Sequence, residues 1–339
     1  MEFRRILVRA SNWVGDAVMC VPALQALRER FPQAYIAILA RPWVADLYAR
    51  EPFCDELIPY NLPRGTKGLY KKWLFARRLS KYAFDCAILL PNAFEAAALA
   101  RIAGIPARIG YSREGRGWLL THPIPIPNRG ETPPHQRFYY LELLKRATLI
   151  REYSDNDPIR LSGWANIPVQ EGKIGVSPGA AYGGAKRWIP ERFAAAAVSI
   201  ARERQGSVAV FGSKDEFPIC EIVRRNVELA GVQCKNFAGA TTLAEFIKLA
   251  ASCEVFVTND SGPMHIASAL GVPTVAVFGA TDEFATGPTG EHSRVVRVPV
   301  ECSPCLRREC PIDHRCMTAV SADAVADVAL SLIAIERKA

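Results

Sequence analysis

The feature that most constrains the fold of this chain is an alternation of short apolar runs with longer amphipathic stretches. In the first half, the apolar run Arg5–Arg9 precedes a polar loop, and apolar residues then recur at helical spacing from Ala17 to Phe31. A repeated strand–loop–helix unit favours crossover connections and a parallel sheet covered by helices. The sequence therefore predicts an α/β protein.

The same pattern continues along both halves. Further runs of strand length lie at Tyr35–Leu39, Asp85–Leu90 and Arg108–Tyr111, and then at Lys173–Ser177, Ser207–Phe211, Glu254–Thr258 and Pro273–Phe278. Helices are expected at Glu191–Arg204, Glu216–Ala230, Thr242–Ala251, Pro263–Leu270 and Ala322–Ile335. Two consecutive doubly wound sheets are the arrangement that this order predicts.

The length of 339 residues suits two domains, each with its own core. The stretch Asp155–Gly172 contains two prolines and two glycines and has weak periodicity, which is typical of a linker. We place the boundary near Leu161, so the predicted domains are residues 1–161 and 162–339. The second would include the cysteine-rich segment 302–316 and the C-terminal helix.

Composition excludes several classes of protein. Half of the residues are hydrophobic and 22% are charged, which excludes disordered and collagen-like chains. No apolar run approaches the roughly 18 residues of a membrane span. A signal peptide is not expected, because Arg9, Asn12 and Asp16 interrupt the N-terminal apolar segment. A cytoplasmic protein is predicted.

The net charge of +8 is concentrated in the first half. Residues 1–165 carry 24 basic and 15 acidic side chains, whereas residues 166–339 carry 18 and 19. Between Asn61 and Tyr82 no acid occurs, and the basic residues are Arg64, Lys67, Lys71, Lys72, Arg77, Arg78 and Lys81, interleaved with aromatic and leucine side chains. This segment suits an anionic lipid surface or nucleic acid. The alternative is a solvated helix whose aromatic face packs on the domain.

The loop after the first strand is Ala10–Asp16. It lacks the G-x-G-x-x-G pattern, which argues against a nicotinamide-dependent enzyme. Asp16 stands where a helix begins. It either caps that helix or acts as a general base aimed into a site.

Two loops of the second half are suited to binding phosphate. The glycine-rich loop Ser177–Trp188 allows backbone amides to approach an anion and contains Lys186. The turn Thr258–His265 places Pro263 in a first helical turn and leaves the amides of Ser261 and Gly262 near a helix N-terminus. The alternative is that Asp260 and Ser261 only cap the helix and that His265 is an interior residue.

These motifs together resemble a known family. Segments Arg9–Asp16, Gly183–Trp188, Phe237–Leu243 and Thr258–His265 are similar, in order and spacing, to the bacterial ADP-heptose:lipopolysaccharide heptosyltransferases of glycosyltransferase family 9, most closely to the heptosyltransferase II branch. The resemblance implies the GT-B fold, in which two Rossmann-like doubly wound parallel-sheet domains face a central cleft. The N-terminal domain would bind the acceptor and the C-terminal domain the nucleotide sugar.

The resemblance also implies roles for individual residues. Asp16 would deprotonate the acceptor hydroxyl as it attacks the anomeric carbon. Lys186 and the amides of Ser261 and Gly262 would stabilise the departing ADP. The reaction that the resemblance implies is an inverting transfer that does not depend on a metal ion.

Further residues are implied for the donor site. Asp260 and His265 would complete it, and Thr241 matches a position near the adenine. Asp215 or Glu216 would meet the ribose, and the sequence leaves open which.

The implied partners are ADP-heptose, an anionic lipid A-core acceptor and an anionic membrane surface, with no cofactor and no nucleic acid. The protein would then be peripheral on the inner face of the inner membrane. One alternative is a related ADP-heptose transferase that acts on a protein or another core sugar. The other, from a different class, is a non-catalytic RNA-binding protein, which no RNP motif supports.

Ten cysteines are present, and four lie in the pattern Cys302-x2-Cys305-x4-Cys310-x5-Cys316, with His314 inside it. Such clustering suggests zinc or an iron–sulfur centre, although the spacing is not a common zinc pattern. Free or oxidised thiols are the alternative. The other six, expected to be small core residues, are Cys20, Cys54, Cys86, Cys220, Cys234 and Cys253.

Overall fold

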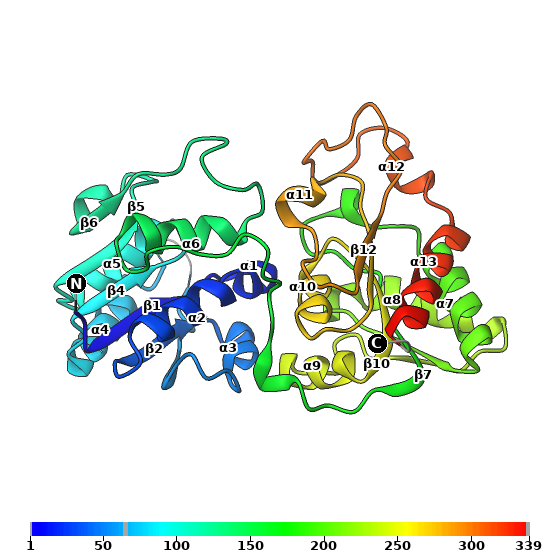
Figure 1. Ribbon diagram of the computed structural model, residues 1–339, viewed down its shortest axis with the longest axis horizontal. Coiled ribbons are helices and arrows are strands. Elements are labelled where there is room, and N and C mark those ends of the chain that lie inside the picture. Colours follow the sequence, from blue (N-terminus) through cyan, green and yellow to red (C-terminus); the bar gives the residue numbers. More distant parts are fainter. Residues whose placement is uncertain (1, 64–66, 337–339) are drawn as a thin grey trace. The chain divides into compact units, whose positions relative to one another are not determined.

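The computed structural model of the chain describes residues 2–63 and 67–336. It divides into two compact units, Met1–Asp157 and Pro158–Ala339, each drawn as a separate body of helices around a sheet (Figure 1). The division falls inside the predicted linker Asp155–Gly172, a few residues before Leu161.

The first unit contains a six-stranded parallel sheet. Its strands are β1 (Arg5–Arg9), β2 (Tyr35–Ala40), β3 (Glu56–Pro59), β4 (Cys86–Leu89), β5 (Ala107–Tyr111) and β6 (His122–Ile124). They are ordered β3-β2-β1-β4-β5-β6. In register, Arg9 pairs with Leu39 on one side and with Leu89 on the other. The four inner strands are almost wholly buried, as expected for strands covered on both faces.

Helices cover both faces of this sheet. They are α1 (Val14–Met19), α2 (Val21–Arg30), α3 (Pro42–Tyr48), α4 (Leu69–Leu79), α5 (Phe94–Ile102) and α6 (Arg137–Arg146). Helices α4 and α5 pack together over one face, and α2 packs against α6 over the other (Figure 1). The single helical stretch expected after the first strand is two helices, because the chain is interrupted at Cys20 and Pro22 lies in the first turn of α2.

The second unit repeats this topology. Its strands are β7 (Gln170–Ser177), β8 (Ser207–Val210), β9 (Cys234–Asn236), β10 (Cys253–Asn259), β11 (Thr274–Val277) and β12 (Ser293–Val296). Their order is β12-β11-β10-β7-β8-β9, and every pairing is parallel. In each unit the first strand lies beside the fourth, and the order in which strands are added to the sheet reverses at that point. This is the doubly wound arrangement of Rossmann-like domains.

The helices of the second unit form two layers. They are α7 (Pro190–Arg204), α8 (Phe217–Leu229), α9 (Leu243–Ala251), α10 (Gly262–Ala269), α11 (Glu283–Thr286), α12 (Arg315–Thr318) and α13 (Ala322–Glu336). Helices α7, α8 and α13 enclose the larger core with one face of the sheet, and α9 and α10 pack on the other (Figure 1).

The predicted α/β class is confirmed. The strands predicted from apolar runs are all present, within a few residues of their predicted ends. Four strands were not predicted, namely β3, β6, β9 and β12. They lie at or next to the sheet edges, have three or four residues each and are only partly buried, so they lack the continuous apolar run that identifies a central strand.

Candidate functional site

The candidate site residues follow strands next to the point where each sheet reverses its strand order. In the second unit, the loops after β7 and β10 contain Lys186 and Asp260. In the first unit, the loop after β1 leads to Asp16. Ligands of open parallel sheets bind beyond the carboxyl ends of strands at this switch point.

Lys186 and Asp260 form a buried ion pair. Lys186 Nζ lies 2.5 Å from Asp260 Oδ2, although 74 residues separate them in the chain. Their side chains are 13% and 4% exposed. The same ammonium group lies 4.9 Å from the centre of the Tyr182 ring. The structure therefore brings together two residues that the sequence assigned to the donor site.

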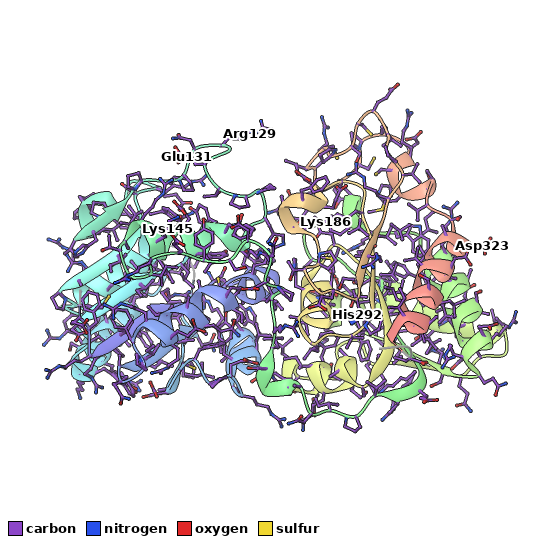
Figure 2. The ribbon with its side chains drawn as sticks, viewed as in Figure 1. Arg129, Glu131, Lys145, Lys186, His292 and Asp323 are labelled. Atoms are coloured by element: carbon purple, nitrogen blue, oxygen red, sulfur yellow. The ribbon has the colours of Figure 1, made fainter. Side chains whose placement is uncertain are left out.

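Two threonines complete the surroundings of Asp260. Thr281 donates to Asp260 Oδ2 at 2.6 Å, and Thr286, from α11, donates to the same oxygen at 3.5 Å. Figure 2 shows Lys186 beside the α11 segment. Both threonines were missed from the sequence, because nothing in the chain around them has a motif that distinguishes a ligand-facing threonine from a loop residue. The pattern that could have indicated them is their position after β11, the strand next to β10.

The N-terminus of α10 lies next to this pair in the chain. Ser261 is its N-cap residue, but its side chain makes no capping hydrogen bond, and Ser261 Oγ instead lies 3.3 Å from Thr258 Oγ1. Helix N-terminal amides that no side chain caps can bind an anion. The alternative in which Asp260 or Ser261 only caps the helix is not the arrangement observed. His265, one turn into α10, is buried.

Asn259 anchors the glycine-rich loop to the end of β10. Its side-chain oxygen accepts from the Trp188 amide at 2.9 Å, and its Nδ2 donates to Pro178 O at 2.8 Å. Both ends of the loop that contains Lys186 are thereby held to the strand that leads to Asp260. Trp188 itself is fully buried.

The cysteine-rich segment 302–316 forms hydrogen bonds to the glycine-rich loop that contains Lys186. Glu309 accepts from the Gly184 amide at 3.0 Å, and Ala185 N donates to Arg308 O at 2.9 Å. His314 Nε2 lies 3.0 Å from Ala185 O. A side chain at Gly183 would collide with Arg308 O, its ideal Cβ lying 2.2 Å away. Segment 302–316 therefore positions Lys186 from outside the sheet.

The cysteines in that segment are free thiols. Cys302 is exposed, Cys305 and Cys310 are half-buried, and Cys316 is buried. Burial and the three neighbouring thiols raise the pKa of Cys316. Within the part of the chain that the structure describes, no three His, Cys, Asp or Glu side chains are arranged to hold a metal ion. Among the other six cysteines, Cys54 and Cys234 are half-buried and the rest are buried.

The two acids expected near the ribose, Asp215 and Glu216, lie in different surroundings. Glu216 Oε2 accepts from the Ser213 amide at 2.8 Å, in a capping box after β8. A Cβ at Gly179 would lie 2.2 Å from Glu216 Oε1, so this carboxylate lies against the loop after β7. Asp215 is exposed. Thr241 lies in the loop between β9 and α9, next to the N-cap residue Thr242.

In the first unit, Asp16 is the third residue of α1, and the N-cap residue is Trp13. Tyr140, from α6, donates to Asp16 Oδ1 at 3.2 Å. Burial, together with the nearby Cys20 and Asp16, raises the pKa of Tyr140 well above its usual value, so the hydroxyl stays a donor at neutral pH. Asp16 is half-buried and held by a residue more than 120 positions away.

The basic segment differs from expectation in two respects. Lys72 is buried and paired with Glu95, so it is not part of a cationic surface. The helix face that packs on the unit is Lys72, Ala76 and Leu79, whereas the large apolar side chains Leu69, Tyr70, Trp73 and Leu74 are exposed. The alternative, in which the aromatic face of this helix packs on the domain, is therefore wrong. Only Phe75 among the aromatic side chains of α4 is half-buried, and it contacts Tyr60. Arg64 lies outside the described residues.

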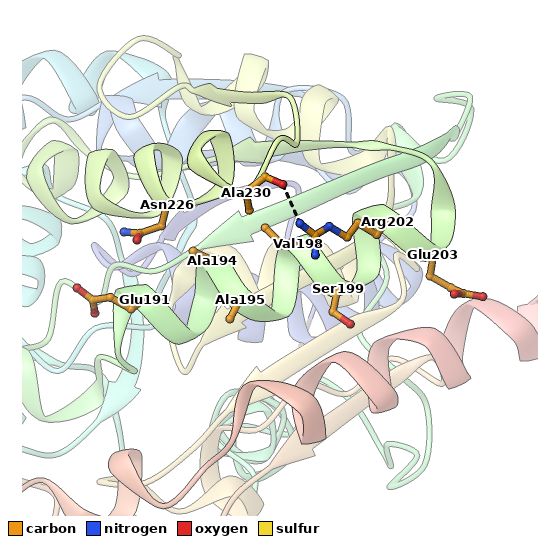
Figure 3. Close-up of a pocket in the computed structure, with 9 residues that line it drawn as sticks. All are labelled: Glu191, Ala194, Ala195, Val198, Ser199, Arg202, Glu203, Asn226 and Ala230. Atoms are coloured by element: carbon orange, nitrogen blue, oxygen red, sulfur yellow. Dashed lines mark hydrogen bonds between the residues drawn. The ribbon is translucent and has the colours of Figure 1, made fainter.

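A separate surface groove of about 690 Å³ lies between α7 and α8. Its lining includes Ala194, Val198 and Arg202, and Arg202 Nη2 donates to Ala230 O at 2.8 Å (Figure 3). No residue of the Lys186–Asp260 site lines it, and it lies along the outer helices of the unit. We do not assign the donor site to this groove.

Two Rossmann-like units, of which the second has a buried Lys–Asp pair at its strand switch point, have the domain composition of GT-B glycosyltransferases. The family model of glycosyltransferase family 9 (heptosyltransferase) matches residues 73–315. Lipopolysaccharide heptosyltransferase 2 of Escherichia coli K12 is 33% identical over 311 residues, covering 87% of this chain and 88% of that one. The chain belongs to glycosyltransferase family 9 and is an enzyme of the heptosyltransferase type.

Other similarities agree with this assignment. The structure of E. coli ADP-heptose LPS heptosyltransferase II matches with a TM-score of 0.81 and 28% identity, over 98% of this chain and 99% of that one. Lipooligosaccharide heptosyltransferase 2 of Campylobacter jejuni (strain NCTC 11168) is 27% identical over 97% of this chain and 98% of its own length. The structure of E. coli heptosyltransferase WaaC with ADP, 17% identical with a TM-score of 0.76, shares the fold over 97% of this chain and 99% of that one. The predicted GT-B class is confirmed. Among the described residues, no helix is both long and apolar enough to cross a membrane.

Proposed function

We propose that this enzyme transfers L-glycero-D-manno-heptose from ADP-heptose to the heptosylated Kdo2-lipid A inner core, with inversion at the anomeric carbon. The observation that carries the proposal is the Lys186–Asp260 pair beside the uncapped N-terminus of α10, in a chain of the heptosyltransferase family. That arrangement presents one cation and a set of amides to the same place, which is what a diphosphate leaving group requires.

On the donor side, Lys186 binds the diphosphate of ADP, and the amides of Ser261 and Gly262 bind it from the helix N-terminus. Asp260 keeps the Lys186 ammonium in place before the donor arrives. His265 donates to the leaving group from within α10. When the bond between the anomeric carbon and the diphosphate oxygen breaks, its electron pair remains on ADP, and the cation and amides stabilise that charge.

Two further residues are proposed to bind the nucleoside of the donor. Glu216 accepts hydrogen bonds from the ribose, because its carboxylate lies against Gly179 at the end of the central strand β7, whereas Asp215 is exposed. Thr241 contacts the adenine from the loop after β9. Glu216 follows β8, which pairs with β7, and Thr241 follows β9, the edge strand that pairs with β8.

On the acceptor side, Asp16 acts as the general base. Its carboxylate takes the proton of the acceptor hydroxyl while that oxygen forms a bond to the anomeric carbon of the heptose. The Tyr140 hydroxyl holds one oxygen of this carboxylate in place. No step in this scheme needs a metal ion, because Lys186 and the amides supply the positive charge.

The proposal is tested by incubating the protein with ADP-heptose and heptosylated Kdo2-lipid A, and by scoring ADP release together with product mass. The Asp16→Asn variant should lose about 10² to 10⁴ in rate while its affinity for ADP stays within a few-fold. EDTA should leave the rate unchanged. Full activity of the Asp16→Asn protein, or loss of activity in EDTA without unfolding, would contradict the mechanism.

We further propose that α4 docks the enzyme on an anionic membrane, where the lipid acceptor lies. Leu69, Tyr70, Trp73 and Leu74 are exposed along a helix whose other exposed side chains include Lys71, Arg77 and Arg78. Exposed aromatic and leucine side chains beside cations are typical of helices that lie in a bilayer interface. Replacing Tyr70 and Trp73 by serine should weaken binding to anionic vesicles. If that variant bound anionic vesicles as well as the wild type does, α4 would not be part of the docking surface.

Another acceptor, a protein or a different core sugar, is compatible with the donor site just described, because acceptor choice lies in the first unit. Offering heptosylated and heptose-free Kdo2-lipid A in parallel separates these possibilities. Product from the heptosylated acceptor only would support the heptosyltransferase II assignment.

A further inference from the structure

Two buried guanidinium groups lie at the carboxyl edge of the first sheet. Arg9 is the last residue of β1, Arg41 follows β2 directly, and Tyr60 follows β3 directly. Arg9 and Arg41 are 5% and 4% exposed. The guanidinium carbon of each lies 4.7 Å from the centre of the same Tyr60 ring, so the two cations can be no further apart than twice that distance.

These two arginines are bonded to neutral groups. Arg9 donates to Ala10 O at 2.5 Å and to Asn12 Oδ1 at 2.7 Å. Arg41 donates from Nη1 to Leu62 O at 2.6 Å and to Tyr60 O at 3.3 Å. The Arg41 Nε is buried and has no hydrogen-bond partner among the residues that the structure describes. Among the described residues, neither arginine forms an ion pair with a carboxylate.

The nearby carboxylate of this cluster is already shared with other groups. Glu95 accepts from the Tyr60 hydroxyl and pairs with Lys72, which is itself buried. Within the described residues, Glu95 is therefore bonded to Tyr60 and Lys72 and forms no ion pair with Arg9 or Arg41. Burial, reinforced by Arg41, lowers the pKa of Arg9 to about 10, as expected for a cation without a counter-ion.

Burying charge without a counter-ion is unfavourable, and cation–π contact with Tyr60 offsets only part of that cost. An arrangement of this kind is stabilised when an anion enters it. Guanidinium groups suit phosphate and carboxylate in particular, because their planar fork can donate two parallel hydrogen bonds.

The cluster is connected to the loop that leads to Asp16. Asn12 accepts from Arg9 through its side chain, and its backbone oxygen accepts from Trp43 Nε1 at 3.0 Å. Trp43 is 46% exposed and lies with its ring 5.6 Å from the Arg41 guanidinium carbon. An anion held by Arg9 and Arg41 would therefore belong to a molecule bound beside the proposed base.

We propose that Arg9 and Arg41 form an anion-binding subsite that takes a phosphate or carboxylate group of the acceptor and so orients the acceptor toward Asp16. This inference rests on the proposed function, in that it assumes an acceptor bound by the first unit. The subsite provides two guanidiniums, of which Arg41 has a donor available at Nε, and Asn12 fixes its distance from the α1 loop.

The first test measures binding of inorganic phosphate by calorimetry, with ADP at saturating concentration to occupy the donor site. Arg41→Gln and Arg9→Gln should each weaken phosphate binding about ten- to hundredfold, the effect of losing one charge-assisted contact. Arg108→Gln is the matched control for Arg41→Gln. Like Arg41, Arg108 donates to backbone oxygens, at Leu119, Ile105 and Pro106, but it lies in another part of the unit. Equal phosphate affinity in Arg41→Gln and wild type would overturn the proposal. Because this test needs no transfer activity, it remains decisive if the proposed reaction fails.

The second test is kinetic. Arg41→Gln should raise KM for the acceptor about ten- to hundredfold with KM for ADP-heptose unchanged, and Arg41→Lys, which keeps the charge, should lie between Gln and wild type. Repeating the assay with a dephosphorylated acceptor shows which acceptor group the subsite binds. If Arg41→Gln no longer raises the acceptor KM, the group is a phosphate. If the KM is still raised, the group is a carboxylate. An acceptor KM that is unchanged in a folded Arg41→Gln protein would refute the inference. If Arg41→Gln unfolds, the same comparison is made with Arg41→Lys, whose phosphate affinity must then fall measurably below that of wild type.

Discussion

Replacing Lys186 by methionine tests the donor site most directly, because methionine keeps the length of the side chain and removes its charge. The Lys186 ammonium lies 2.5 Å from Asp260 Oδ2. At an effective dielectric constant of about 20, this separation corresponds to about 7 kcal/mol of Coulomb attraction. Desolvation of the two groups offsets much of that attraction, so the net effect is smaller.

Breaking a buried pair by removing one partner typically costs about 3 to 5 kcal/mol. In Lys186→Met, the hydroxyls of Thr281 and Thr286 still donate to Asp260. We therefore expect the unfolding free energy of the second unit to fall by about 3 kcal/mol, the lower end of that range. Urea denaturation followed by circular dichroism, with the two units fitted as separate transitions, measures this loss.

Measuring ADP affinity distinguishes the role of Lys186 from the role of Asp260. Lys186→Met should weaken ADP binding by about 1.5 to 3 kcal/mol, roughly ten- to 150-fold in Kd, because a charge-assisted contact to the diphosphate is lost. Asp260→Asn keeps the ammonium and should change the ADP Kd by only about a few-fold. In the double variant the stability losses should be sub-additive by about 2 kcal/mol, as expected for residues in contact. A Lys186→Met protein with wild-type stability and wild-type ADP affinity would refute both the pair and the site.

Three other variants test separate parts of the structure. Glu309→Gln should weaken ADP binding about three- to tenfold, because Glu309 holds the Gly184 amide of the Lys186 loop; an unchanged ADP titration would show that segment 302–316 does not position that loop. Tyr140→Phe should lower kcat about two- to tenfold with KM for the donor unchanged, since its hydroxyl holds Asp16 Oδ1; a wild-type kcat would show that this bond does not orient the carboxylate. Glu221→Gln should destabilise the protein at neutral pH only slightly, by about 0.3 to 0.5 kcal/mol for each exposed helix pair. Because its hydrogen bond to Arg224 holds the pKa of Glu221 at about 2, below the unfolded value, the difference from wild type should be present above about pH 5 and disappear as the pH falls toward 2. A difference that does not change with pH in urea denaturation would contradict this assignment.

The central strands and most helices could be predicted from the sequence, because their burial produces a regular pattern of apolar residues. Strand β1 runs over Arg5–Arg9, as its apolar run predicts, and β10 and β11 are continuous apolar runs because both faces of the sheet are covered. Edge strands such as β9 have one open side and few buried positions. Their pairing is decided by the neighbouring strand, which local sequence does not contain.

The sequence by itself also determined the family, since Lys186, Asp260 and Asp16 lie in motifs that can be recognised along the chain. Contacts across the fold were decided only by tertiary structure. Lys72 belongs to a run of basic residues, yet the fold buries it against Glu95 while aromatic neighbours on α4 remain exposed. Likewise, Arg9 and Arg41 become one cluster only because β1 and β2 are adjacent and parallel, so that their carboxyl ends meet at the same edge. The physical reason is that residue type and spacing determine which strands and helices form, whereas the neighbours of a charged side chain depend on which strands pair.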